Sequence, residues 1–305
     1  MNLVICRFAG ILLTLLISAT ANADTAAIAP NDSPQSIDEL KTQLEKILKD
    51  SHTPGLSVAI VHHDGPEWVA GLGVADVATN RPATEKTLFR IGSVSKGFAS
   101  LAILQLVNEG RLSLLDPVHK LVPEVWFDNS WESTDPVRVA DLLEHTTGWD
   151  DMHLREYAKD APASMTLREA LDYDHHSRTS RWKPGTRMAY CNSGPAVAAY
   201  IVEKLSGQRF EDYVRQHLFD PIGMRTATYF QPPAESTVTL YRMDGSTPYP
   251  YWNILFRPSG AINASAEDMA AYLQFYLNRG KVKDQQIVPS SSIDRMETPT
   301  RDWAA

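Results

Sequence analysis

The chain has 305 residues, of which 43% are hydrophobic and 22% are charged. This composition excludes a disordered, collagen-like or disulfide-scaffold protein, and the presence of only two cysteines excludes a zinc ribbon or a disulfide framework. Lysine and arginine number 29 against 37 aspartates and glutamates, a net charge of −8 that argues against a phosphate backbone as a partner. We therefore expect a globular protein that binds no nucleic acid.

Residues 1–23 predict a secretory signal peptide. The short apolar run Ala9–Ile17 follows Arg7, and Ala21-Asn22-Ala23 is an A-x-A cleavage signature. The run is too short to span a bilayer, and no later apolar stretch approaches ~18 residues. We therefore expect a polar linker at 24–35, no transmembrane segment after cleavage, and a periplasmic or secreted location. The sequence assigns no oligomeric state.

The next segments predict a helix followed by a β-hairpin. Ser36 and Glu39 have the spacing of a capping box, which predicts a helix that runs to about Asp50. Leu56–Val61 and Trp68–Val74 are typical of strands, and the Asp-Gly pair between them predicts the turn of a hairpin.

The rest of the chain is predominantly helical by its pattern. Apolar spacing predicts short helices between about 112 and 190 and longer helices at the following segments: Ser93–Asn108, Ala196–Leu205, Phe210–Leu218 and Ser265–Asn278. Strands first, then a helical middle and further helices, predict an α/β fold of the α+β type. We expect an antiparallel sheet flanked by helices, with a helical region inserted beside it.

A serine and a lysine near the start of the Ser93–Asn108 helix carry the first chemical signal. Ser93 and Lys96, at i and i+3, lie on one helix face, so the amine can take the serine proton. The unpaired N–H groups at a helix start can stabilise an oxyanion. A second S-x-x-K, Ser180 to Lys183, is followed by Pro184, so no helix can present that pair. Read alone, Ser93 is better explained as a helix-capping serine than as a nucleophile.

Tyr190 and Asn192 follow a Lys-Pro-Gly turn and precede a helix. Two residues apart, they point the same way if the backbone there is extended. A phenol can relay a proton, and a carboxamide can hold both a lysine and a substrate carbonyl.

Four segments in order resemble the serine β-lactamase and penicillin-binding-protein-like hydrolases, especially the branch of class C β-lactamases, D-alanyl-D-alanine carboxypeptidases and related esterases. The segments are FRIGSVSK, LLEHTTGW, KPGTRMAYCNSG and PSGAINASAEDMAAYLQF, and the resemblance covers roughly Leu40 to Pro299. It implies a β-lactamase/transpeptidase-like fold, with Ser93 as the acyl-accepting nucleophile and Lys96 as its base partner. It also implies that Tyr190 is a second proton-transfer group and that Asn192 orients Lys96 and the substrate.

The sequence departs from this family in one respect. The family closes its site with a strand that carries K-T-G or H-x-G, but K-T-G is absent here and the one H-x-G, His63-Asp64-Gly65, predicts a turn. We therefore expect residues 36–305 to form a hydrolase domain that lacks the C-terminal strands and helix, and we favour a fragment of a longer protein. An exposed sheet edge and reduced activity would follow.

Several alternatives stay open at this point. We expect an exported serine hydrolase that acts through an acyl-enzyme on a β-lactam, a D-Ala-D-Ala-type peptide or an ester. The first alternative is a non-catalytic or slow-turnover binding module with an acylable serine. The second is an inactive truncated fragment. A Ser-His-Asp hydrolase is a minor alternative, because the elbow-like segment Gly55–Ala59 lies on the opening strand. The histidine pairs lack metal-ligand spacing, so we expect no metal or cofactor. Candidate substrate contacts are Trp149, Tyr249, Tyr251, Trp252 and Phe256.

Overall fold

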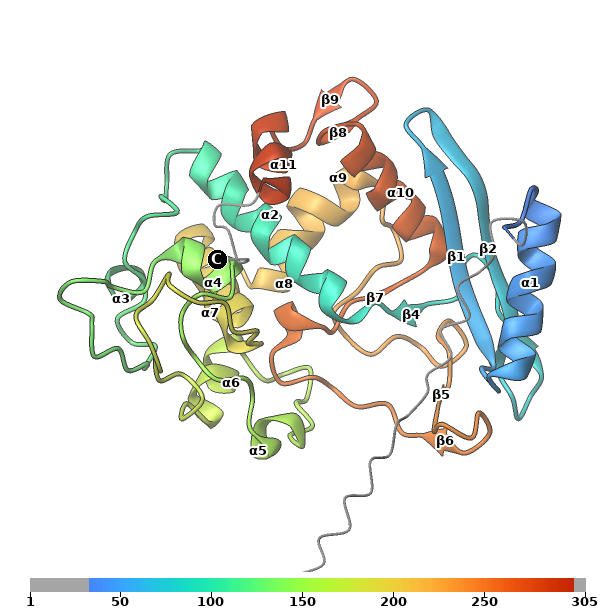
Figure 1. Ribbon diagram of the computed structural model, residues 1–305, viewed down its shortest axis with the longest axis horizontal. Helices are drawn as coiled ribbons and strands as arrows, with labels where there is room; N and C mark the ends of the chain where they lie inside the picture. Colours follow the sequence, from blue (N-terminus) through green and yellow to red (C-terminus); the bar gives the residue numbers. More distant parts are fainter. Residues whose placement is uncertain (1–32, 299–305) are drawn as a thin grey trace, which may run out of the picture.

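The computed structural model describes residues 33–298 (Figure 1). The expected signal peptide and most of the expected linker lie outside the described residues, as does the segment 299–305. Figure 1 shows two parts side by side, a small β-sheet with α1 and α10 packed against it, and a larger region built mainly of helices. None of the helices among the described residues is both long enough and apolar enough to cross a bilayer.

The N-terminal sheet forms as the sequence predicts. The hairpin consists of β1 (Gly55–His62) and β2 (Gly65–Asp76), and β3 (Arg81–Pro82) pairs with the far edge of β2. The preceding helix α1 (Ile37–Asp50) begins at the predicted cap, where the Ser36 side chain accepts a hydrogen bond from the N–H of Glu39.

Helices lie along this sheet. In Figure 1, α10 (Ala266–Leu277) lies on the side toward the helical region and α1 on the outer side. Within residues 33–298, β1 pairs with a strand along one edge only. The start of α10 is fixed by a capping box, because Ser265 and Asp268 exchange hydrogen bonds between side chain and backbone.

The core of the helical region is built around α2 (Ser95–Asn108) and α7 (Ser193–Ser206), which pack against each other. Both helices bury most of their residues, so they behave as core helices rather than surface helices. Gly194 permits the close packing of α7 on α4 (Val139–Leu143), because a Cβ there would lie 2.7 Å from the carbonyl oxygen of Leu142.

Between α2 and α7 lies the inserted helical region that the sequence predicts. It contains four short helices: α3 (Val118–Leu121), α4 (Val139–Leu143), α5 (Leu154–Tyr157) and α6 (Leu167–Tyr173). Further short elements follow along the chain. They include β4 (Phe89–Arg90), β5 (Leu240–Tyr241), β6 (Pro248–Tyr249), η4 (Arg257–Ser259), β7 (Asn263–Ala264), β8 (Lys281–Val282), β9 (Gln285–Gln286) and α11 (Ser290–Glu297).

One predicted helix is interrupted. The segment expected as a continuous helix over Phe210–Leu218 is α8 (Phe210–Val214), followed by a π-helical turn, η3 (Arg215–Phe219), and by α9 (Asp220–Ile222). The apolar spacing is similar in both conformations, so periodicity alone does not distinguish them. The fold class is otherwise as predicted, with antiparallel strands flanked by helices and a helical insertion.

Candidate active site

Ser93 lies in a tight 3-10 turn, η2 (Gly92–Val94), that leads directly into α2. The sequence predicts that the helix begins at Ser93, but in the structure the α-helix begins at Ser95. The reason is that the Ser95 N–H bonds to the carbonyl of Gly92 in the i→i+3 pattern of a 3-10 helix. The turn requires a φ of 56° at Gly92, which a glycine adopts without strain. At the start of a helix, the Ser93 N–H has no partner within the helix and can donate to an oxyanion.

The hydroxyl of Ser93 lies between two proton-carrying groups. The Nζ of Lys96 donates a hydrogen bond to Ser93 Oγ at 3.0 Å, and the Tyr190 hydroxyl lies 2.6 Å from the same oxygen. The Lys96 ammonium also lies 4.8 Å from the centroid of the Tyr190 ring. The nucleophile candidate thus has two neighbours within the distance that proton transfer requires.

Lys96 has an acceptor for each of its three N–H bonds. Besides Ser93 Oγ, Nζ donates to the side-chain oxygen Oδ1 of Asn192 at 2.8 Å and to the main-chain carbonyl of Ser259 at 2.7 Å. Ser259 belongs to η4, and its own hydroxyl donates to the carbonyl of Asn192. The three acceptors fix the ammonium beside Ser93.

Asp151 is a member of this network that the sequence analysis did not name. One carboxylate oxygen accepts hydrogen bonds from the main-chain N–H of Asn192 at 3.0 Å and from its side-chain Nδ2 at 2.9 Å, and the Tyr157 hydroxyl donates to the other at 2.7 Å. Burial would raise the pKa of Asp151, but the hydrogen bonds it accepts outweigh burial and hold the pKa below its usual range. Burial and the bond to Asp151 raise the pKa of Tyr157 to about 12, so Tyr157 remains a donor.

The imidazole ring of His145 packs against the ring of Tyr190. The two rings lie 4.6 Å apart between centroids, and His145 Nδ1 accepts a hydrogen bond from the Cys191 N–H. Burial and, secondly, the positive charge of Lys96 lower the pKa of His145. The ring is therefore neutral near pH 7, with its proton on Nε2. His145 follows α4 in a turn, where it adopts a φ of 58°.

A pocket of about 260 Å³ opens beside Ser93. The polar residues of its lining are Arg90, Ser93, Tyr157, Asn192 and Ser259, and the apolar wall includes Trp252. Such a mixture of an apolar wall and a few polar groups is typical of a small-molecule site.

The aromatic residues singled out from the sequence are placed differently from one another. Trp149 is fully buried and packs against Phe127 in the core, so the expectation that it lines the pocket is wrong. Phe256 is likewise buried in the core. Trp252 lines the pocket, and Tyr251 stacks on the guanidinium of Arg90.

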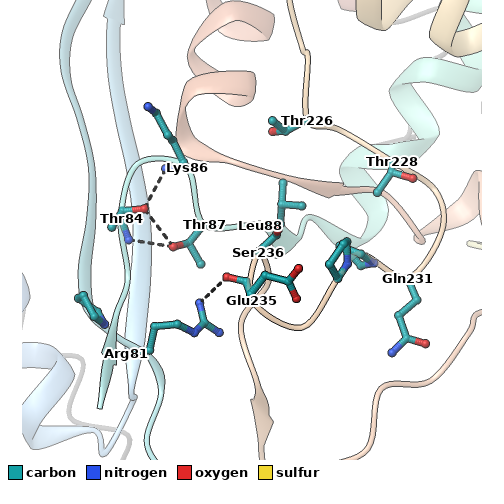
Figure 2. A pocket seen from close by; sticks show the side chains of 13 residues that line it. Arg81, Thr84, Lys86, Thr87, Leu88, Thr226, Thr228, Gln231, Glu235 and Ser236 are labelled. Atoms are coloured by element: carbon teal, nitrogen blue, oxygen red, sulfur yellow. Dashed lines mark hydrogen bonds between the residues drawn. The ribbon is translucent and has the colours of Figure 1, made fainter. Parts of the chain in front are cut away.

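A larger cavity, of about 750 Å³, lies elsewhere, between the segment before β4 and the loop after α9 (Figure 2). Two of its threonines, Thr84 and Thr87, lie 3.2 Å apart between hydroxyl oxygens, and the Thr84 hydroxyl also accepts a hydrogen bond from the main-chain N–H of Lys86. Arg81 donates to main-chain carbonyls, including that of Glu235. Lys86 and Ser236 both line this cavity, but no hydrogen bond joins them, and its lining among the described residues contains no tyrosine, so size alone does not locate the chemistry.

The weaker sequence motifs have structural roles. Ser180 is buried and donates to the carbonyl of Thr147, and Lys183 forms an ion pair with Asp135, so the second S-x-x-K presents no paired amine. Ser57 of the elbow-like segment lies within β1. Among residues 33–298, no three His, Cys, Asp or Glu side chains cluster closely enough to hold a metal ion.

Comparison with known proteins identifies the family to which this fold and site belong. Residues 40–303 match the family described as Beta-lactamase, and the chain belongs to that family. A solved structure of the octameric penicillin-binding protein homologue from Pyrococcus abyssi aligns with a TM-score of 0.74 and 28% identity, over 86% of this chain and 60% of that one.

Two curated relatives show similar degrees of likeness. Protein flp of Staphylococcus aureus strain MW2 is 31% identical over 257 residues, which cover 81% of this chain and 50% of the relative. A beta-lactamase from Yersinia enterocolitica is 27% identical over 232 residues, which cover 76% of this chain and 57% of the relative. The chain thus spans about half the length of these curated relatives.

Proposed function

We propose that this chain is a serine hydrolase that acts through an acyl-enzyme on Ser93. The observation that carries the proposal is the position of Ser93 Oγ, 3.0 Å from Lys96 Nζ and 2.6 Å from the Tyr190 hydroxyl. A serine is a weak nucleophile until a neighbour accepts its proton, and here two groups share that task. We further propose, on the basis of the Tyr-x-Asn pair Tyr190 and Asn192, that the chain belongs to the branch of class C β-lactamases, D-alanyl-D-alanine carboxypeptidases and esterases.

In the acylation step, Ser93 Oγ attacks the substrate carbonyl carbon while its proton passes to the coupled Tyr190 and Lys96 pair. The pair can accept this proton because it enters the step with one proton fewer than a phenol and an ammonium hold together. The electron pair of the carbonyl bond moves onto oxygen, where the N–H of Ser93 donates a hydrogen bond. The bond to the leaving nitrogen or oxygen then breaks, and the leaving atom takes the proton from the same pair. The Lys96 charge stabilises negative charge on the phenol oxygen during both transfers.

In the deacylation step, water attacks the ester carbonyl carbon of the acyl-enzyme and gives a proton to the Tyr190 and Lys96 pair. The ester bond to Ser93 breaks, and the proton returns to Oγ. The substrate is a β-lactam, a D-Ala-D-Ala-type peptide or an ester. The proposed place of action is the periplasm or the exterior of the cell, as the A-x-A signature before Asp24 predicts.

Active-site labelling tests the proposal. A fluorophosphonate probe should label the wild-type protein and Ser57→Ala, but not Ser93→Ala. Ser57 is the matched control because it lies in the elbow-like segment of β1 and would be the nucleophile of the Ser-His-Asp alternative. Labelling that survives in Ser93→Ala and disappears in Ser57→Ala would reverse the assignment.

A further inference from the structure

Tyr190 has few restraints for a side chain that must keep a proton-transfer distance. It is 42% exposed, and within residues 33–298 its hydroxyl makes one hydrogen bond, to Ser93 Oγ. Its backbone belongs to no helix or strand, because residues 188–191 precede α7 without regular structure. The one bond at the hydroxyl joins Tyr190 to the group that reacts, so other contacts must fix the ring in the productive geometry.

His145 binds the backbone on both sides of Tyr190. Its main-chain carbonyl accepts the N–H of Ala189 at 2.8 Å, and its ring atom Nδ1 accepts the N–H of Cys191 at 3.3 Å. In an extended chain the N–H groups of residues i and i+2 point to the same side, so one neighbouring residue can accept both. The two hydrogen bonds fix the stretch of backbone from which the Tyr190 side chain projects.

The imidazole of His145 also restrains the side chain of Tyr190. The two rings lie 4.6 Å apart between centroids, with 30° between their planes. Aromatic rings at this separation attract each other, so the imidazole limits how far the phenol can swing away. His145 therefore contacts Tyr190 in two ways, through the face of its ring and through the backbone on either side of it.

His145 can hold Tyr190 because its own position is fixed. It follows α4 directly, and the next residue, Thr146, is fully buried. Thr146 donates from its N–H to the main-chain carbonyl of Asp141 in α4 and from its hydroxyl to the Asp141 carboxylate. The φ of 58° at His145 lies in a region that residues other than glycine occupy infrequently, and such outliers cluster at functional sites.

The contacts of His145 separate it from the reacting groups. Its described contacts are with the Tyr190 ring and with main-chain N–H groups, and it is not in the lining of the pocket beside Ser93. Burial and, secondly, the charge of Lys96 lower its pKa, so Nδ1 stays an acceptor near pH 7. Removal of a residue that acts only through another should change kcat and leave KM almost unchanged.

We propose that His145 is a positioning residue that keeps the Tyr190 hydroxyl at Ser93, by binding the backbone on both sides of Tyr190 and by packing against its ring. This inference rests on the proposed function, because it names the residue that fixes a proton-transfer group of Ser93. Two of the contacts come from the imidazole, namely the hydrogen bond from the Cys191 N–H and the packing of the rings. Each of these two contacts can be removed without the other.

The kinetic test removes the two imidazole contacts together and one at a time, with 4-nitrophenyl acetate as the substrate. His145→Ala removes both and should lower kcat by about 10- to 100-fold with little change in KM, the loss expected when a catalytic group is misplaced by about 1 Å. His145→Asn keeps an acceptor for the Cys191 N–H and tolerates a positive φ, whereas His145→Phe keeps the ring. Each should therefore lose less activity than His145→Ala, at a temperature where the melting curves show all variants folded.

A double-mutant cycle distinguishes positioning of Tyr190 from a general loss of structure. Tyr190→Phe leaves no hydroxyl to position, so adding His145→Ala to it should lower kcat little further. His175→Ala is the matched control, because the His175 ring packs against Trp126 at 4.3 Å between centroids and not against the site. Its kcat should equal that of the wild type. Losses that multiply in the double variant, or an unchanged kcat in His145→Ala, would overturn the inference.

Failure of the proposed function gives a different pattern, with no Ser93-dependent turnover of the ester by the wild type. Crystal structures of the wild type and of His145→Ala then test the positioning by itself. We expect the Tyr190 hydroxyl within hydrogen-bonding distance of Ser93 Oγ in the wild type, and beyond it or in more than one conformer in His145→Ala. A Tyr190 side chain that keeps the same position in both structures would contradict the role of His145.

Discussion

Asn192 can accept a hydrogen bond from Lys96 only if its amide oxygen, and not its nitrogen, faces the ammonium. The carboxylate of Asp151 enforces this orientation, because it can only accept and therefore binds the nitrogen Nδ2 at 2.9 Å. Asp151 touches none of the proposed reacting atoms in the described network. It is a positioning residue for Asn192 and, through it, for Lys96.

Asp151→Asn should lower kcat by about 10- to 100-fold, the range typical of groups that orient a functional side chain, with little change in KM. The new asparagine side chain carries an N–H donor as well as an oxygen acceptor. It therefore no longer forces the Asn192 amide to turn its nitrogen toward residue 151 and its oxygen toward Lys96. Asp150→Asn is the matched control, since the Asp150 carboxylate pairs with Arg181 and accepts the main-chain N–H of Asp151, an acceptor that an asparagine oxygen keeps, but bonds to neither Asn192 nor Lys96. Steady-state kinetics and melting temperatures of both variants give the answer. A loss of activity that merely follows a loss of stability would reduce Asp151 to a structural role.

His145 makes the stability of the site depend on pH. Its pKa is lowered in the folded state, so the unfolded chain binds the proton more readily. The contribution of His145 to the free energy of unfolding is therefore fully present above the ordinary histidine pKa of about 6.5. It is lost as the pH falls below that pKa and through the lower pKa that His145 has in the folded state. Between pH 8 and 5, the melting temperature of the wild type should fall by more than that of His145→Gln. Equal losses in the two proteins would mean that His145 contributes nothing to the pH dependence.

At the scale of elements, a buried ion pair fixes the position of η4, whose last carbonyl accepts a hydrogen bond from Lys96. The Nε of Arg257 in η4 lies 2.5 Å from the Oε1 of Glu211 in α8, and both side chains are almost fully buried. Ser259, at the end of the same turn, offers its carbonyl to Lys96. The pair thus links a helix of the core to the geometry around Ser93.

Removing one partner of this pair should be far more damaging than removing both. Arg257→Met leaves the Glu211 charge buried and should cost about 3–5 kcal/mol of unfolding free energy. The double variant Glu211→Leu/Arg257→Met removes both charges and should recover a large part of that loss. Urea unfolding of the single and double variants measures both quantities. If the two costs simply add, the charges are not coupled as the contact indicates.

Elements with a local signal could be predicted from the sequence, whereas elements formed by distant pairing could not. The capping residues Ser36 and Ser265 and the hairpin turn at Asp64 all occur where local patterns place them. The two-residue strands β4 and β7 have no periodicity of their own and exist only because they pair across the chain. The π-helical turn after α8 is likewise set by packing and not by its apolar spacing.

The same distinction applies to the candidate site. Ser93 and Lys96 could be paired from helical spacing alone, and Tyr190 and Asn192 were named from their loop and from the family resemblance. The carbonyl of Ser259 carries no side-chain signal, so the sequence could not reveal it. Asp151 follows the turn at His145 as one of two adjacent aspartates, and only the tertiary structure shows that it is the one bonded to Asn192.

At the scale of the whole molecule, the site is assembled from four segments that lie apart in the sequence. Residues 92–96 lie at the start of α2, 145–157 lie in the inserted region, 190–192 lie just before α7, and 257–259 form η4. Because α2 and α7 form the core, the hydrogen-bonded cluster exists only when these parts fold together. The chemistry of Ser93 therefore reports on the entire fold.

The most direct test of the account is to trap the acyl-enzyme and locate it. The protein is mixed with benzylpenicillin or 4-nitrophenyl acetate, quenched in acid at successive times, and analysed by intact mass and peptide mapping. The account predicts one acyl group per chain, located on the peptide that contains Ser93, which forms and then decays as the substrate is consumed. A stable adduct on Ser93 would indicate a binding module instead of a hydrolase. Acylation at another residue, or none with either compound, would contradict the central claim.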